Sequence, residues 1–228
     1  MSNILVIAAH PDDEVLGVGG TMAVLSRRHA VSVLIVTEGC SSQYEGEDVP
    51  EIIRIKKECA RKANRLLGVE RVLFGDLPDM KLDSVPHVQI NRVIEQAVEE
   101  VQPDIVFTHH FGDVNMDHKR VFESTMVAAR PTAGSRIKKV YTYETLSSTE
   151  WQSADPRQIF VPQAYVDIQD TLEKKAAALE LYNQEVREFP HPRSAQAVRN
   201  LAAMRGQSVG LYAAEAFGVI RERITGEI

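Results

Sequence analysis

The sequence has little cysteine, no excess of positive charge and no long hydrophobic run. Cys40 and Cys59 are its only two cysteines, too few for a disulfide-rich scaffold or a cysteine-rich zinc site. The 26 lysines and arginines are outnumbered by 32 aspartates and glutamates, so nucleic acid and anionic membranes are poor candidates for the main partner. The longest apolar stretches, such as 4–9 and 31–36, fall far short of the ~20 residues that cross a bilayer. We therefore expect a cytoplasmic protein without a membrane span that does not bind nucleic acid.

The composition is that of an ordinary globular protein, with 44% hydrophobic and 25% charged residues in a chain of 228. This length fits one domain. We expect an α/β core over residues 1–145 and a C-terminal extension over 146–228 that packs on it. The sequence leaves open whether the protein forms a homo-oligomer.

Strand-length apolar runs alternate with amphipathic segments over the first two thirds of the chain. The runs cover residues 4–9, 31–37, 71–74, 104–108 and 139–143, and the helical patterns cover 15–28, 51–67, 88–101 and 117–129. This alternation predicts a doubly wound, mostly parallel, Rossmann-like sheet of order 3-2-1-4-5. Asp48 is the expected cap of the second helix, with Gly68 as its stop.

The last third is expected to add helices and strands to this core. A strong helical pattern covers residues 172–188, and the prolines of Phe189-Pro190-His191-Pro192 must end it. Ser194 is a candidate cap for a further helix through residue 204.

The first chemical motif, Ala9-His10-Pro11-Asp12-Asp13-Glu14, lies where the first strand ends and its helix begins. Ligands of open α/β sheets bind at this edge. His10 and Asp13 are three residues apart, so one turn brings both to the same side. An imidazole with a carboxylate is a normal pair of zinc ligands, and Asp12 beside them is where a base acting on water would lie. The alternative is that the aspartates only cap the helix.

The second motif, over residues 108–118 after the fourth strand, holds three histidines and two aspartates. In the predicted order, the first and fourth strands are neighbours. His118 would then face His10 and Asp13 across one crevice. Two histidines and one carboxylate leave a position open for water, the pattern of a catalytic zinc site, although such a triad also suits Fe(II).

The His10-Pro11-Asp12-Asp13-Glu14 motif, with Gly19-Gly20 behind it and Asp-His after the fourth strand, resembles the PIG-L/LmbE-like zinc-dependent N-acetyl-sugar deacetylases. The resemblance covers most of the chain up to about residue 143. It implies hydrolysis of a linear amide, removing an acetyl group from an amino sugar or its conjugate. It also implies that His10, Asp13 and His118 bind the metal, and that Asp12 is the general base.

Two further residues match substrate-binding residues of this family. Arg54 matches an arginine that holds substrate, and Asp79 matches an aspartate that binds the sugar. The alternatives are a helix-surface ion pair of Arg54 with Glu58, and a turn residue after Pro78.

The second motif departs from the family at one position. Many relatives have His-x-x-His there, whereas this chain has Asn115 three residues before His118. An amide donates a hydrogen bond but supplies no proton. Asn115 is therefore expected only to stabilise the oxyanion, and His109 and His110 to orient groups rather than donate protons, which leaves both proton transfers to Asp12.

Arg193 lies in a rigid basic loop, His191-Pro192-Arg193, that could reach over the site and hold an anionic group. Its alternative role is an ion pair with a surface carboxylate.

Two other functions stay open for the whole chain. A nucleotide-dependent transferase or oxidoreductase needs a glycine-rich turn after the first strand, where His10-Pro11-Asp12-Asp13 lies instead. A non-catalytic module that binds a metal or a sugar is the other.

Overall fold

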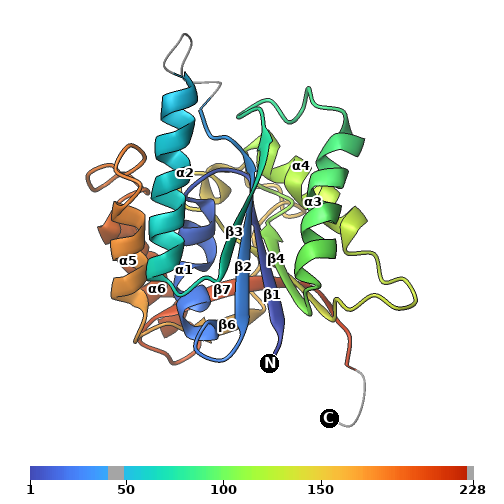
Figure 1. Cartoon of the computed structure of the whole chain (residues 1–228). Helices are drawn as coiled ribbons and strands as arrows, with labels where there is room; N and C mark the ends of the chain where they lie inside the picture. The colour runs from blue at the N-terminus through green and yellow to red at the C-terminus, as the bar shows by residue number, and fades with distance from the viewer. Residues whose placement is uncertain (41–48, 225–228) are drawn as a thin grey trace.

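A computed structural model describes residues 1–40 and 49–224 of the chain. In this part, seven strands form one sheet of order β3-β2-β1-β4-β5-β7-β6 (Figure 1). The strands are β1 (Asn3–Ala8), β2 (Ala30–Thr37), β3 (Arg71–Leu77), β4 (Ile105–His109), β5 (Lys139–Tyr143), β6 (Ala164–Asp167) and β7 (Ala214–Glu222). The helices are α1 (Asp13–Leu25), α2 (Val49–Leu66), α3 (His87–Val101), α4 (Met116–Ala128), α5 (Leu172–Glu180) and α6 (Ala195–Gln207), with a short 3₁₀ turn η1 (Thr149–Trp151).

The strand order confirms the predicted doubly wound sheet. The first five strands are parallel and follow the order 3-2-1-4-5. Beyond β5, the C-terminal third adds β7 and β6, both paired antiparallel. The sequence led us to expect strand additions here but did not locate them.

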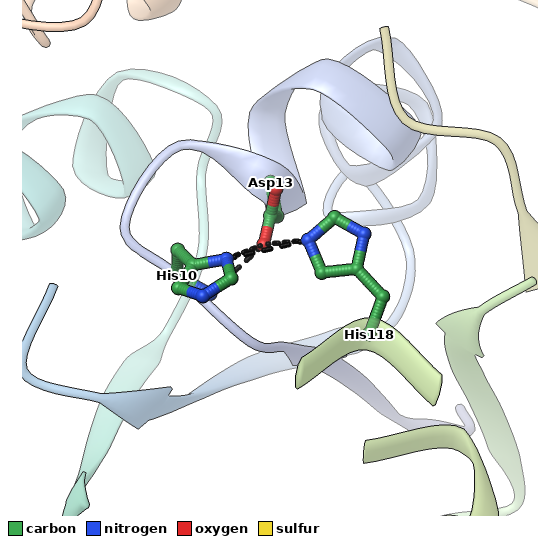
Figure 2. A group of neighbouring side chains, drawn as sticks. All are labelled: His10, Asp13 and His118. Carbon is green, nitrogen blue, oxygen red and sulfur yellow. Dashed lines mark hydrogen bonds and ion pairs between the residues drawn. The ribbon is translucent and has the colours of Figure 1, made fainter. Parts of the chain in front are cut away.

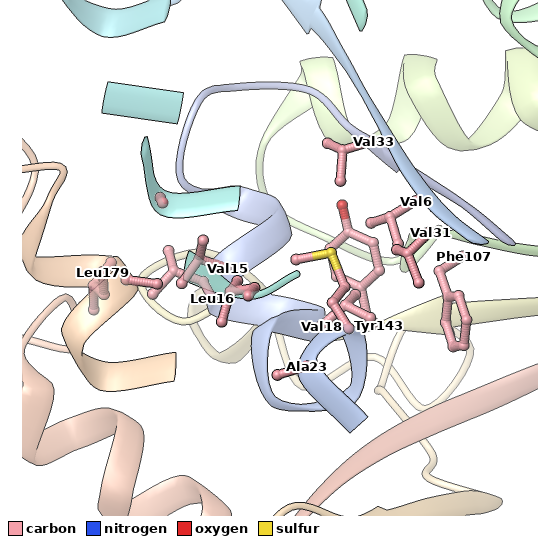
Figure 3. Packing of buried hydrophobic residues seen from close by; sticks show 14 of the residues in the cluster. Val6, Val15, Leu16, Val18, Ala23, Val31, Val33, Phe107, Tyr143 and Leu179 are labelled. Carbon is pink, nitrogen blue, oxygen red and sulfur yellow. The ribbon is translucent and has the colours of Figure 1, made fainter. Parts of the chain in front are cut away.

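Helices cover both faces of the sheet, with α1, α2, α5 and α6 on one side and α3 and α4 on the other (Figure 1). The side chains of β1 alternate between the two cores. Ile4 and Val6 join the cluster that α1 covers, whereas Leu5 and Ile7 join the one that α3 covers. Burial on both faces explains why this strand is continuously apolar. Figure 3 shows part of the first cluster, including side chains of α1 and α5.

Two glycines allow α1 to lie close against its neighbours. A Cβ on Gly17 would overlap the ring of Tyr143, and a Cβ on Gly20 would come within 2.8 Å of Ile168. These contacts explain the glycines in the middle of a helix. They give the glycines a packing role in α1, not a role in a dinucleotide-binding turn.

A buried ion pair fastens the middle of α1 to the C-terminal third. Lys175 Nζ lies 2.6 Å from Glu215 Oε1 and donates to the carbonyl oxygen of Leu16. The Glu215 carboxylate accepts from the backbone N–H groups of Gly20 and Thr21 at 2.9 and 2.7 Å. Lys175 on α5 and Glu215 on β7 thus bind the helix that begins at the first motif.

A second carboxylate ties the N-terminus of the sheet to the segment before β5. Asp104 accepts from the backbone N–H of Asn3 at 2.9 Å and from Arg136 Nε at 3.2 Å. Burial alone would raise the pKa of Asp104, but these two donors outweigh it and hold the pKa below its usual value.

The C-terminal helices differ from expectation at one boundary. The predicted extension of α5 to residue 188 is wrong, because the helix ends at Glu180. Beyond it, the chain turns to bring Tyr182 and Glu185 to buried partners, Glu14 and Lys56. Ser194 caps α6 as predicted, accepting from the N–H of Ala197 at 3.1 Å. The predicted cap Asp48 lies outside the described residues.

Candidate metal centre

The two motifs meet at the carboxyl ends of β1 and β4, which are adjacent in the sheet. His10 and Asp13 follow β1, at the turn into α1, and His118 lies in the first turn of α4. Figure 2 shows the carboxylate of Asp13 between the two imidazoles. The structure therefore brings the three predicted metal ligands together.

The donor atoms of these three residues form a nearly equilateral triangle. His10 Nδ1 lies 3.1 Å from Asp13 Oδ2, His118 Nε2 lies 3.2 Å from the same oxygen, and the two nitrogens are 3.3 Å apart. Zinc with bonds of about 2.0–2.1 Å has tetrahedral ligands about 3.3–3.4 Å apart. The triangle therefore has the dimensions of one face of a zinc tetrahedron.

The charges around the triangle also suit a cation. All three residues are buried, and Asp13 Oδ1 has no hydrogen-bond partner among the described residues. Burial opposes protonation of His118, but the carboxylates of Asp13 and Asp113 outweigh it and raise its pKa to about 9. Burial also disfavours the charged form of Asp13 and would raise its pKa, yet the imidazole of His118 holds that pKa well below its usual value. The same excess of negative charge would favour a divalent ion.

Each histidine is oriented by a further carboxylate through its other ring nitrogen. His118 Nδ1 lies 3.2 Å from Asp113 Oδ2, and His10 Nε2 lies 3.1 Å from Asp117 Oδ2. Such outer carboxylates fix the ring and the tautomer of a metal-binding histidine. Both aspartates belong to the second motif, but no role was predicted for them; their position close to His118 in the sequence is the signal that indicates one.

Asp12 lies beside the triangle but outside it. Its backbone adopts φ 120° and ψ −27°, a conformation that costs a non-glycine residue on the order of 1–3 kcal/mol. The side chain is 1% exposed, and its Oδ2 has no hydrogen-bond partner among the described residues. Burial raises the pKa of Asp12 to about 7, with Arg193 opposing the rise. A buried carboxylate with one oxygen outside any hydrogen bond and a pKa near neutrality is suited to accept a proton.

Arg193 reaches this carboxylate from the segment between α5 and α6. Its Nη1 lies 3.6 Å from Asp12 Oδ2 and 3.1 Å from Glu185 Oε2, and its Nε donates to Ser147 Oγ at 2.8 Å. A quarter of its side chain is exposed. The structure thus places Arg193 at the site rather than in a surface ion pair.

Asp79 and Asn115 border the site on other loops. Asp79 is 2% exposed, and its Oδ1 lies 3.5 Å from His10 Nε2, so its carboxylate joins Asp117 around that ring. His10, Asp79 and Asp117 form a second group with metal-ligand spacing. Asn115 Oδ1 caps α4 by accepting from the N–H of Asp117 at 2.9 Å. Its Nδ2 lies 3.5 Å from Met80 Sδ.

His109 and His110 have different surroundings. The Nε2 atom of His109 accepts from the N–H of Ala9 at 2.9 Å, and its ring stacks on that of His118 with centroids 3.9 Å apart. Burial, together with the neighbouring His118, holds the pKa of His109 well below its usual value. His110 donates through Nε2 to the Gln158 carbonyl oxygen at 2.8 Å. Both therefore have contacts expected of neutral, orienting histidines.

Arg54 is not brought to the triangle. Its side chain is 62% exposed on α2, where Nη2 lies 2.7 Å from Glu51 Oε1 and Nη1 lies 3.4 Å from Glu58 Oε2. This is the helix-surface ion pair named as its alternative. A role in substrate binding stays a prediction.

Comparison with known proteins places the same motifs in one family. The family model described as PIG-L, GlcNAc-PI de-N-acetylase, matches residues 5–129. The uncharacterized deacetylase YaiS of Escherichia coli K12 is 28% identical over 175 residues, covering 73% of this chain and 82% of that protein. Among solved structures, the N,N'-diacetylchitobiose deacetylase of Pyrococcus horikoshii superposes with a TM-score of 0.76 at 23% identity, over 96% of this chain and 83% of that one. The 4-carboxy-2-hydroxymuconate hydratase GalB of Pseudomonas putida KT2440 superposes with a TM-score of 0.72 at 23% identity, over 100% of both chains.

Proposed function

Because this chain belongs to the PIG-L (GlcNAc-PI de-N-acetylase) family, matched over more than half of its length, we propose that it is a metal-dependent N-deacetylase acting on an amino sugar or its conjugate. The observation that carries this proposal is the buried carboxylate of Asp12, whose Oδ2 has no hydrogen-bond partner among the described residues, beside the His10, Asp13 and His118 triangle. Three ligands with one open position, next to an unligated carboxylate, are the arrangement that hydrolytic metal sites use.

The residues of the triangle would hold Zn²⁺, with Fe²⁺ as the alternative that the same ligands accept. When bound, the ion would polarise the amide carbonyl and lower the pKa of the attacking water. Asp113 and Asp117 would keep the two imidazoles in the tautomer that binds metal.

Asp12 takes both proton transfers in this proposal. It accepts a proton from the attacking water, and it then donates that proton to the nitrogen of the departing amine, so that amide and water give acetic acid and the free amine, which become acetate and an ammonium by proton exchange. A neutral His109 and a His110 engaged with Gln158 support this assignment, because neither holds a proton poised for the leaving group.

Three side chains that border the site would act on the substrate. Arg193 carries a positive charge next to Asp12 and is partly exposed, so it is suited to bind oxygens of the substrate as well as to favour the ionised base. Asn115 Nδ2 is a neutral donor that would hydrogen-bond the oxyanion. Asp79 would accept from sugar hydroxyls.

The family and the diacetylchitobiose deacetylase fold support an N-acetylated sugar as substrate. No helix among the described residues combines the length and apolar character needed to cross a bilayer. We propose that the enzyme acts in the cytoplasm on a small N-acetylated sugar or conjugate.

Acetate release tests this function. The protein is freed of metal with a chelator, reloaded with Zn²⁺ or Fe²⁺, and incubated with N-acetylglucosamine, N,N'-diacetylchitobiose and N-acetylglucosaminyl conjugates. We expect acetate from at least one of them, loss of activity after chelation, and recovery with metal. Equal activity before and after verified removal of metal would overturn the metal-dependent reaction.

A further inference from the structure

Glu14 is a fully buried carboxylate that the proposed reaction does not use. It is the second residue of α1, and its side chain is inaccessible to solvent. Oε1 accepts from Asn64 Nδ2 at 2.8 Å and from the Tyr182 hydroxyl at 2.5 Å, and Oε2 accepts from the backbone N–H of Asp12 at 3.2 Å. Three donors from three parts of the chain thus converge on one side chain.

The bond to Asp12 is made where the backbone is most unusual. The φ of 120° at Asp12 lies in a region that side-chain-bearing residues rarely adopt. That dihedral sets the direction of the Cα–Cβ bond, and hence where the carboxylate lies relative to the metal ligands. The conformation persists only if surrounding contacts over-determine it. The Glu14 carboxylate supplies one such contact to the N–H of the strained residue itself.

The other partners of Glu14 hold that contact in place. Asn64 Nδ2 also donates to the carbonyl oxygen of Ala60 at 2.9 Å, which fixes the orientation of its amide and leaves it a donor toward Glu14. Tyr182 comes from the chain beyond α5 and is 3% exposed. Since both donors already occupy Oε1, only Oε2 is left for Asp12. A glutamine here would place an amide nitrogen against at least one of these N–H or O–H groups.

We propose that Glu14 is a positioning residue that holds Asp12 in its strained backbone conformation and so directs the carboxylate of the base. This inference rests on the proposed function, in which Asp12 is the general base. It assigns Glu14 no proton transfer and no contact with the metal or the substrate.

The test compares Glu14→Gln with Glu215→Gln. Glu215 is a matched control, because its buried carboxylate also accepts backbone N–H bonds from α1, but at Gly20 and Thr21, far along the helix from Asp12. Metal content, kcat and KM for acetate release are measured below the unfolding temperature of each variant. We expect Glu14→Gln to retain its metal and its KM while kcat falls by about 10- to 100-fold, the worth of a hydrogen bond to a charged acceptor. Glu215→Gln should lose stability but keep kcat within about threefold, well below that loss.

A kcat of Glu14→Gln equal to that of Glu215→Gln would overturn the inference. If Glu14→Gln does not fold, Tyr182→Phe decides, since it removes one donor that fixes the carboxylate. A fall in kcat of more than about threefold at full metal loading, beyond the range allowed for Glu215→Gln, supports positioning, and a smaller change contradicts it.

The amide proton of Asp12 provides a readout that does not depend on activity. Its hydrogen exchange, followed by NMR, should accelerate in Glu14→Gln and stay unchanged in Glu215→Gln. An inactive wild-type protein with this exchange pattern would count against the proposed function alone, whereas an active wild type without it would count against the role of Glu14.

Discussion

Replacing Arg193 by methionine should move the acidic limb of the kcat/KM profile toward higher pH. Methionine keeps an unbranched apolar stem and removes the charge, together with the hydrogen bonds of the guanidinium to Ser147 and Glu185. Because the positive charge next to Asp12 favours the ionised carboxylate, its loss leaves burial to raise the pKa of Asp12 further above the value of about 7. A general base must be deprotonated to act, so activity in the variant should require a higher pH.

The size of the shift follows from the geometry. Two unit charges 3.6 Å apart, at an effective dielectric constant of about 20, interact with about 4–5 kcal/mol as an upper limit. Glu185 also lies 3.1 Å from the guanidinium, and a quarter of the Arg193 side chain is exposed. The interaction of Arg193 with Asp12 is therefore weaker than this limit. One pKa unit corresponds to about 1.4 kcal/mol. We therefore expect the limb to move by about one to two pH units.

The assay is acetate release from pH 5 to 10 at full metal loading, with Arg187→Met as the control. Arg187 belongs to the same segment but donates to the carbonyl oxygens of Gln184 and Val186, so its profile should match the wild type. Arg193→Lys, which keeps a charge, should shift the limb less than Arg193→Met. A loss of kcat/KM that is uniform with pH, with the acidic limb unmoved, would refute the electrostatic coupling and leave Arg193 acting on substrate only.

Three further predictions concern stability and the remaining histidines. Lys175→Met should cost about 3–5 kcal/mol in urea unfolding, because it leaves Glu215 buried without its cation, and the double variant Lys175→Met/Glu215→Leu should cost less than the sum of the single changes; strictly additive costs would argue against coupling. The pKa of Asp104 is lowered in the fold, so its contribution to stability is present above the unfolded pKa and is lost as pH falls through the folded one; Asp104→Asn should be less stable than wild type at pH 7, and the gap should close on acidification, whereas a gap independent of pH would contradict this. His109→Gln and His110→Gln should each leave the basic limb of kcat/KM in place, and loss of that limb with metal intact would make that histidine the general acid.

The sheet and the meeting of the two motifs were predictable because they depend on local patterns. Continuous apolar runs such as 4–9 identify strands buried on both faces, and their alternation with helices indicates parallel strands, for which 3-2-1-4-5 is the order expected of a doubly wound sheet. That order makes β1 and β4 neighbours, so His10 and His118 had to approach each other. The three-residue spacing of His10 and Asp13 also predicted that Asp13, and not Asp12, lies on the same side as His10.

Contacts between distant segments were not predictable in the same way. The end of α5 at Glu180 depends on tertiary partners of Tyr182 and Glu185, although the helical pattern continues to 188. Arg193 lies 181 positions from Asp12 in the chain, and no periodicity links them. The positive φ of Asp12 was not predictable either, because aspartate at a helix start normally indicates an ordinary cap.

We propose that the adjacent carboxylates Asp12 and Asp13 have different roles, and one comparison tests this directly. Metal content and acetate release are measured in parallel for the wild type, Asp12→Asn and Asp13→Asn. We expect Asp12→Asn to keep about one metal ion per chain and to lose on the order of 10²–10⁴ in rate, the usual worth of a general base, while Asp13→Asn loses the metal. Loss of metal from Asp12→Asn to the same extent as from Asp13→Asn would contradict the division of roles.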